Sequence, residues 1–238
     1  MPDLVLAPAK LTRTLRITGV RDDGYHLIDA EMVSVDLVDE LSLSDGDGLE
    51  LVGAAADVPV GADNLVCRAL TAVGRSAQVR VVKRIPSGAG LGGGSADAAA
   101  VLRWAAVRDL AVAATLGADV PFCVVGGRAQ VTGAGEAVVS LPFEALTFTL
   151  LTPPVVCSTA EVYRAWDDLG GPTAQGANDL EPAALAVAPA LARWRDVLGD
   201  ATGQTPTLAG SGSTWFVEGD FPGEGRVVVR SLPASGDA

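Results

Sequence analysis

The stretch from Pro86 to Ser95 constrains this chain more than any other part of its sequence. It reads PSGAGLGGGS and lies between an alternating apolar run, residues 78–85, and an alanine-rich segment, residues 96–107. The alternation predicts a strand and the alanine-rich segment predicts a helix. Because glycine has no side chain, a loop of this kind can turn tightly and bring its backbone close to a ligand.

The helix predicted to begin near Ser95 strengthens this loop as a binding site. A helix N-terminus carries unpaired N–H groups and a partial positive charge, so loop and helix together favour a polyphosphate. A flexible linker is the alternative interpretation. Two common nucleotide motifs are not met. A P-loop needs a lysine after the glycines, and none follows here. Gly88, Gly90 and Gly93 have the spacing of the dinucleotide-binding motif, but that motif also needs a following strand that ends in an acidic residue, and none follows.

Composition and charge narrow the classes of function. The 238 residues are 49% hydrophobic and 19% charged, which excludes a disordered chain, and no apolar run is long enough to span a membrane. The net charge of −12, without a basic cluster, disfavours nucleic acid and anionic membranes as partners. The N-terminus lacks the pattern of a signal peptide, so we expect a soluble, cytoplasmic protein.

The cysteines and the single histidine exclude further chemistry. Cys67, Cys123 and Cys157 are odd in number and far apart, which predicts free thiols in a reducing compartment. Because His26 is the only histidine, multi-histidine metal centres are excluded. No G-x-S-x-G motif accompanies it to support a serine hydrolase triad.

The order of the expected elements indicates an α+β protein. We expect strands at residues 4–17, 30–38, 40–43, 49–52, 78–85, 128–132, 137–141, 147–151 and 214–217. We expect helices from a cap at Asp63 or Asn64 to residue 73, and at 96–107, 159–168, 180–188 and 190–198. A seam near residues 143–146 divides the chain into an N-terminal lobe, residues 1–143, and a C-terminal lobe, residues 144–238.

Three segments resemble the motifs of the GHMP kinase superfamily, and their spacing agrees over almost the whole chain. They are Ala7 to Lys10 on the first strand, the glycine loop, and Leu208 to Ser213. Further segments are similar to the 4-diphosphocytidyl-2-C-methyl-D-erythritol kinase family: Asp23 to His26, Gly92 to Gly94, Leu116 to Pro121, Gly133 to Glu136, and Asn178 with Asp179. The segments Asp23 to His26 and Leu116 to Pro121 are far more specific than the glycine loop.

The resemblance implies a fold and a reaction. The fold is the two-lobed α+β GHMP kinase fold, with an ATP-binding N-terminal lobe like ribosomal protein S5 domain 2 and a ferredoxin-like C-terminal lobe. The reaction is transfer of the γ-phosphoryl group of ATP to the C2 hydroxyl of 4-diphosphocytidyl-2-C-methyl-D-erythritol, in non-mevalonate isoprenoid synthesis. Mg²⁺ is expected with the ATP, with the Ser95 hydroxyl as one contact and its other ligands unassigned. The expected partner is this small molecule, and the expected state is a monomer or weak homodimer.

The resemblance makes Asp119 and Lys10 the catalytic pair. A carboxylate can take the proton of an alcohol, and a nearby ammonium can keep that carboxylate ionised. Each residue has another interpretation. Asp119 lies in a segment typical of a turn and is also suited to cap a helix. Lys10 lies on the polar face of a predicted strand, where a lysine is usually solvated.

The resemblance also implies two sets of binding residues. For ATP they are Asn64, Lys83, Pro86, Gly88, Gly90, Leu91, Gly92, Gly93, Gly94 and Ser95. For the acceptor they are Thr12, Tyr25, His26, Thr159, Tyr163, Gly210, Ser211 and Gly212, with the aromatic residues at the cytosine. The alternatives are a helix cap for Asn64, a surface lysine for Lys83 and simple packing for Tyr163. For the second glycine loop, Gly210 to Gly212, the alternative is a tight turn.

Two residues near Lys10 depart from the family pattern. Thr12 stands where family members carry asparagine, so the position keeps a hydroxyl but lacks an amide donor. Arg13 stands where an aliphatic residue is usual, and its charge needs a partner or a path to water. The alternative functions are therefore a kinase of the same fold with another alcohol acceptor, or a catalytically silent nucleotide-binding protein.

Overall fold

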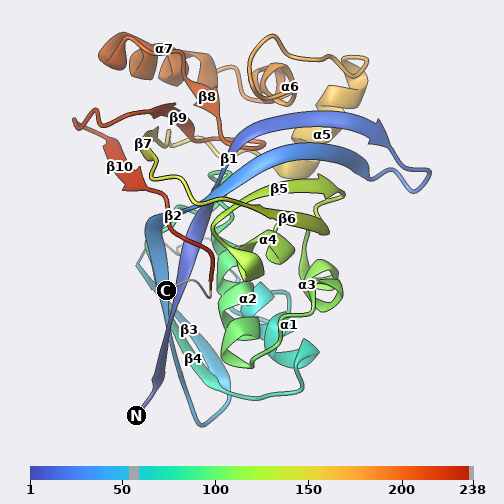
Figure 1. Cartoon of the computed structure of the whole chain (residues 1–238), viewed down its shortest axis with the longest axis vertical. Coiled ribbons are helices and arrows are strands. Elements are labelled where there is room, and N and C mark those ends of the chain that lie inside the picture. The colour runs from blue at the N-terminus through green and yellow to red at the C-terminus, as the bar shows by residue number, and fades with distance from the viewer. Residues whose placement is uncertain (54–58, 236–238) are drawn as a thin grey trace.

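The computed structural model describes residues 1–53 and 59–235 and confirms the α+β class. Two β-sheets lie one above the other in Figure 1, and helices pack on both. The strands are β1 (Asp3–Val20), β2 (His26–Ser44), β3 (Gly48–Gly53), β4 (Gln78–Lys83), β5 (Arg128–Gly133), β6 (Ala137–Leu141), β7 (Thr147–Leu151), β8 (Thr207–Leu208), β9 (Trp215–Glu218) and β10 (Arg226–Arg230). The helices are α1 (Leu65–Ala72), α2 (Gly93–Trp104), α3 (Leu110–Leu116), α4 (Val120–Val125), α5 (Thr159–Asp168), α6 (Glu181–Val187) and α7 (Leu191–Thr202).

Strands β1 and β2 form one long antiparallel hairpin that extends from the lower sheet to the region of α5 (Figure 1). A turn at residues 21–24 closes it: the N–H of Gly24, at φ +84°, donates to the carbonyl of Arg21 over 2.9 Å. The separate strands predicted at residues 30–38 and 40–43 are a single strand, which corrects that expectation. Asp39 does not interrupt β2, because its buried carboxylate accepts two backbone N–H groups of the segment after β4.

A β-bulge at Arg13 breaks the regular alternation of β1. Thr12 pairs with Met32 and Thr14 pairs with Glu31, so Arg13 is an extra residue between the two pairs. An extra residue of this kind bends a strand and re-aims its side chains. Arg13 therefore lies outside the regular alternation of β1.

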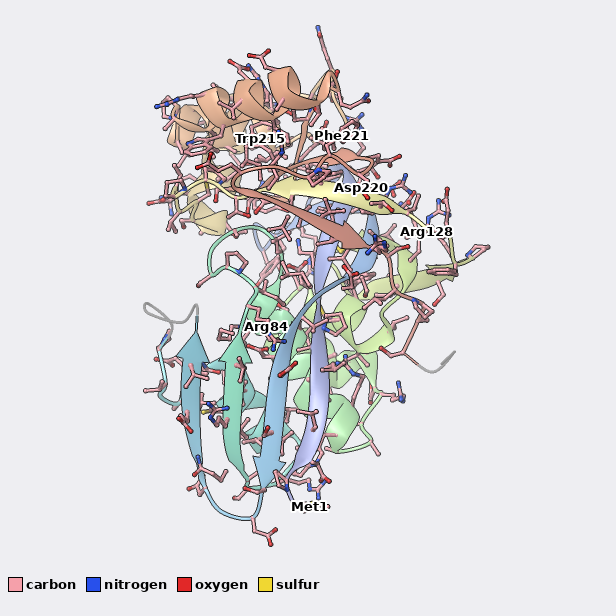
Figure 2. The ribbon with its side chains drawn as sticks, turned by 90° about the vertical axis from the view of Figure 1, so that its left-hand side faces the viewer. Met1, Arg84, Arg128, Trp215, Asp220 and Phe221 are labelled. Atoms are coloured by element: carbon pink, nitrogen blue, oxygen red, sulfur yellow. The ribbon has the colours of Figure 1, made fainter. Side chains whose placement is uncertain are left out.

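The lower sheet has the order β3-β4-β2-β5-β6, with β1 added on β2. Helices α1 to α4 cover one of its faces (Figure 1), and Figure 2 shows the other face, where β1 to β4 carry no helix. The central helix α2 is rich in alanine, and Ala96, Ala98, Ala99 and Ala100 are all buried. Small side chains let α2 pack closely against β1 and the neighbouring helices, which fixes the position of the loop before it.

The upper sheet is antiparallel, in the order β10-β7-β9-β8, and α7 packs on β9. Trp215 on β9 is fully buried in this part of the molecule (Figure 2). Helices α3 and α4 and strands β8 and β10 were not predicted. A short apolar run such as VPFCVV in α4 fits a helix as well as a strand, so periodicity does not identify it.

The chain passes from the lower to the upper sheet between β6 and β7. The boundary predicted between residues 143 and 144 lies in this segment, and as a domain division it stays a prediction. The later part of the chain also contacts β1 through the segment between α5 and α6, where the N–H of Leu15 donates to the carbonyl of Ala177 over 2.9 Å. No helix within residues 1–53 and 59–235 has the length and apolar character to cross a bilayer.

Candidate active site

A cavity of about 880 Å³ brings together β1, the glycine loop, the start of α4, and α5. Most of the predicted site residues line it, although they come from distant parts of the chain. Those on its wall are Lys10, Thr12, Tyr25, His26, Asn64, Lys83, Pro86, Gly88, Gly90, Gly92, Gly93, Gly94, Ser95, Asp119, Thr159, Tyr163, Gly210 and Ser211.

Lys10 and Asp119 form an ion pair on the wall of this cavity. The Nζ of Lys10 lies 3.5 Å from the Oδ2 of Asp119, and it also donates a hydrogen bond to the Oγ1 of Thr12 over 3.1 Å. The lysine side chain is 7% exposed and the aspartate side chain 33%. Asp119 occupies the cap position of α4, but its carboxylate makes no capping hydrogen bond. The carboxylate therefore faces the lysine and the cavity instead of the helix backbone.

The glycine loop is folded against β1 and against the second glycine loop. Gly90 lies at φ +76°, and a Cβ there would meet the carbonyl oxygen of Ala209 at 2.2 Å. A Cβ at Gly92, which lies at φ +68°, would meet the Cγ of Lys10 at 2.6 Å. Both positions therefore require glycine, for backbone conformation and for space. Helix α2 starts directly after Gly92 without a side-chain cap, so its first N–H groups remain available to an anion.

The second glycine loop is held in place by Asn178. The Nδ2 of Asn178 donates to the carbonyl of Leu208 over 2.8 Å and to that of Gly210 over 2.7 Å. On the cavity side, the hydroxyl groups of Ser211 and Thr159 are hydrogen-bonded at 3.0 Å. These contacts place a small, polar turn opposite the first glycine loop.

Lys83 is buried between two carboxylates beside the glycine loop. Its Nζ lies 2.6 Å from the Oδ2 of Asp97 and also donates to the Oδ2 of Asp39. Burial disfavours the charge on Lys83, but the two carboxylates outweigh it and raise the pKa of the lysine. Burial raises the pKa of Asp97 to about 7, an effect that Lys83 opposes and Asp39 enhances. The alternative interpretation of Lys83 as a surface lysine is therefore wrong.

Asn64 caps α1 and lines the cavity at the same time. Its Oδ1 accepts the N–H of Val66 over 2.9 Å, and its Nδ2 donates to the carbonyl of Pro59 over 2.7 Å. Both ends of the amide are thus engaged within the protein. The helix-cap interpretation of Asn64 is confirmed, and the residue contributes shape to the cavity.

The far end of the cavity is aromatic. The imidazole of His26 packs on the ring of Tyr163 with 4.8 Å between centroids, and Tyr25 is exposed at the hairpin turn beside it. Burial, with the charge of Asp119, raises the pKa of Tyr163, so its phenol stays neutral. A neutral aromatic recess of this kind suits a planar base.

The described residues do not form a protein site for Mg²⁺. In residues 1–53 and 59–235 no three His, Cys, Asp or Glu side chains gather as a metal-binding group. Ser95, the one predicted contact, lies on the cavity wall, and the nearby Asp97 binds Lys83 through Oδ2, while its Oδ1 has no hydrogen-bond partner among the described residues. We therefore assign the ion no step in catalysis.

Comparison with known proteins identifies the family. Residues 57–127 match the model of the GHMP kinases N terminal domain. A 4-diphosphocytidyl-2-C-methyl-D-erythritol kinase of Ruegeria pomeroyi is 39% identical, and the match covers 92% of this chain and 89% of that protein. The chain belongs to the 4-diphosphocytidyl-2-C-methyl-D-erythritol kinase family. A kinase of the same name from Granulibacter bethesdensis is 35% identical over 98% of this chain and 90% of its own length.

The fold agrees with membership of this kinase family. A crystal structure of a 4-(cytidine 5'-diphospho)-2C-methyl-D-erythritol kinase matches with a TM-score of 0.77 and 30% identity, over 98% of this chain and 100% of that chain. A homoserine kinase from Cytophaga hutchinsonii shares the fold at a TM-score of 0.57 and 20% identity, over 98% and 96% of the two chains. The predicted GHMP kinase fold is confirmed.

Two residues that the family resemblance assigned to binding do not line the cavity. Leu91 is buried, and its carbonyl accepts the backbone N–H of Lys10 over 3.0 Å. The N–H of Gly212 donates to the carbonyl of Ala209 over 3.0 Å. Both residues shape the glycine loops of this kinase family member from behind the cavity wall.

Three acidic residues at or beneath the site were missed in the sequence. Asp39 and Asp97 hold Lys83, and Asp167 contacts His26. Asp97 carried a usable signal, because a lone charge in an alanine-rich buried helix needs a partner. Asp167 carried another, because it lies one helical turn after Tyr163 and shares its face.

Proposed function

We propose that this protein transfers the γ-phosphoryl group of ATP to the C2 hydroxyl of 4-diphosphocytidyl-2-C-methyl-D-erythritol, a step of non-mevalonate isoprenoid synthesis. The observation that carries the proposal is the Lys10–Asp119 pair, with 3.5 Å between Nζ and Oδ2, on one cavity wall with the glycine loop. The kinase name borne by relatives that match over most of their length supports the same reaction.

Asp119 acts as the base in this proposal. Its carboxylate takes the proton of the C2 hydroxyl while the hydroxyl oxygen forms a bond to the γ-phosphorus of ATP. The bond from that phosphorus to the β,γ-bridging oxygen breaks, and ADP leaves. Lys10 favours the ionised carboxylate and the developing negative charge on the oxygen. General-base catalysis of this kind is worth about 10²–10⁴-fold in rate.

The two ends of the cavity bind the two substrates. The backbone N–H groups of the glycine loop and of the start of α2 hold the ATP phosphates. The recess of Tyr25, His26 and Tyr163 takes the cytosine ring of the acceptor. Lys10 and Asp119 then stand between the phosphate loop and the acceptor, and this positioning supplies much of the remaining rate enhancement.

The proposal is tested by ADP release from the purified protein with ATP and the cytidylylated methylerythritol. We expect turnover, and we expect the phosphorylated product to carry the new ester at C2 by phosphorus NMR. An ATP analogue and CDP should each raise the melting temperature, because a ligand that binds only the folded state stabilises it.

Other outcomes would point to the alternative functions. Stabilisation by the ATP analogue without any effect of CDP would favour another alcohol acceptor. Binding of both ligands without ADP formation would favour a silent nucleotide-binding protein. Either result would overturn the proposed reaction.

A further inference from the structure

The imidazole of His26 is held by one face of helix α5. Its ring packs against Tyr163, with 4.8 Å between centroids and a tilt of 43°, and forms a T-shaped pair with Trp166, at 5.4 Å and 83°. The Nε2 atom lies 2.8 Å from the Oδ1 of Asp167. Trp166 and Asp167 follow Tyr163 by three and four residues, so all three lie on one face of α5.

The orientation of the patch is itself supported. The indole N–H of Trp166 donates to the carbonyl of Pro172 over 3.0 Å, and the hydroxyl of Ser158 caps the start of α5. The His26 side chain is only 10% exposed, so ring rotation would have to displace packed neighbours. The imidazole is therefore presented to the cavity in one orientation.

The contact with Asp167 decides which nitrogen of His26 carries the proton. An ionised carboxylate accepts hydrogen bonds and donates none, so Nε2 must be protonated to bond with it. Among the described residues, none forms a hydrogen bond with the Nδ1 of His26. In the neutral imidazole, Nδ1 is then a free acceptor on a residue that lines the cavity.

We propose that Asp167 is a positioning residue that makes the base site select cytosine over uracil by fixing the tautomer of His26. The proposal rests on the proposed function, which places the base at this end of the cavity. Cytosine carries an amino group at C4 and uracil a carbonyl group. An acceptor at Nδ1 of His26 receives a hydrogen bond from the amino group of cytosine. With uracil, the same acceptor faces the carbonyl oxygen, which is also an acceptor, so neither atom is paired.

The test compares the dissociation constants of CDP and UDP by calorimetry, with the ATP site saturated by a non-hydrolysable ATP analogue. For the wild type we expect CDP to bind about tenfold or more tightly than UDP, because one base-edge contact discriminates by about this factor. In Asp167→Asn the amide can instead donate to Nε2, so both tautomers become accessible. We expect the CDP-to-UDP preference of this variant to fall to about threefold or less.

Asp168→Asn is the matched control. Asp168 is the next residue of α5 and is exposed, and it has no hydrogen bond to His26 within the described part of the chain. Both variants remove one negative charge from the last turn of α5, so a purely electrostatic effect would change both alike. Asp168→Asn should keep the wild-type preference, and Asp167→Glu should restore most of it.

A second comparison tests whether Asp167 acts through His26. His26→Ala should lose the CDP-to-UDP preference, and adding Asp167→Asn to it should change the preference no further. An unchanged preference in Asp167→Asn, or a further loss in the double variant, would overturn the inference. A wild type that binds the ATP analogue but neither CDP nor UDP would overturn the proposed function and this inference with it. A wild type that binds CDP and UDP equally would overturn only the inference.

Discussion

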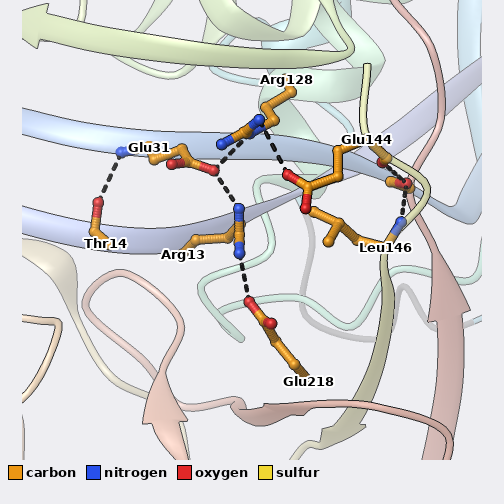
Figure 3. A network of polar contacts seen from close by, with 8 residues as sticks. Arg13, Thr14, Glu31, Arg128, Glu144, Leu146 and Glu218 are labelled. Carbon is orange, nitrogen blue, oxygen red and sulfur yellow. Dashed lines mark hydrogen bonds and ion pairs between the residues drawn. The ribbon is translucent and has the colours of Figure 1, made fainter. Parts of the chain in front are cut away.

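Arg13 on β1 and Glu218 at the end of β9 form an ion pair, so a residue of the lower sheet is tied to a residue of the upper one (Figure 3). Arg13 also pairs with Glu31, which Arg128 holds from the other side at 2.8 Å. The carboxylates of Glu218 and Glu31 outweigh the effect of burial and raise the pKa of Arg13. The charge that departs from the family pattern is thus matched by partners from both sheets.

Arg13→Leu should lower the free energy of unfolding by about 1–3 kcal/mol, because a partly buried carboxylate, Glu31, loses one of its two arginine partners. Glu218→Gln should cost less than about 1 kcal/mol, because the Glu218 side chain is 56% exposed. Urea unfolding of both variants measures these values. Equal losses would show that the contact between the sheets, and not Glu31, dominates the network.

Asp119→Asn should lower kcat by about 10²–10⁴-fold and leave the dissociation constant of an ATP analogue within about twofold. The amide cannot take the proton of the acceptor, but the glycine loop is untouched. Asp119 makes no capping bond, and the amide oxygen of asparagine can still accept a hydrogen bond from Lys10, so stability should change little. Asp109→Asn is the control: it caps α3 through the N–H of Ala111, and asparagine caps equally well. A loss of kcat that follows a loss of stability would contradict the catalytic role.

Gly90→Ala should abolish or strongly weaken binding of the ATP analogue and lower the melting temperature. Its Cβ would meet the backbone of the second glycine loop at 2.2 Å, so the two loops must separate. Gly74→Ala is the control, because Gly74 also has a positive φ, of +64°, but open space around its Cβ position. It should show only the conformational cost of about 1 kcal/mol and normal nucleotide affinity. Equal nucleotide affinity in both variants would contradict the close packing of the loops.

Asp97→Asn should change the pH dependence of stability. Burial raises the pKa of Asp97 from 3.8 to about 7, so between these pH values the folded protein holds a proton that the unfolded chain has released. The free energy of unfolding then falls as the pH rises through this range. The free energy of unfolding of the wild type minus that of Asp97→Asn, measured in urea, should be smaller at about pH 7.5 than at about pH 5. A difference that stays constant with pH would contradict the raised pKa of Asp97.

Local features of the sequence predicted the elements that carry the phosphate site. The alternation of β4, the glycines after it and the alanine-rich run of α2 are all local patterns, and the structure has a strand, a loop and a helix there. The prediction for α5 matches the structured residues 159–168 because a serine cap and helix-forming residues coincide. Helix α4 was missed because a six-residue apolar run has no distinguishing period.

Residue types and their spacing along the chain indicated the glycine loops and the family resemblance, and that resemblance implied the pairing of Lys10 with Asp119. Folding alone decided that Lys83 is enclosed by Asp39 and Asp97, that Arg13 joins two sheets, and that Asp167 orients His26. The physical reason is that charge pairing and tautomer choice depend on distances of a few ångströms between side chains on remote elements. Local periodicity records which face of an element is buried, but it does not record which remote residue that face will meet.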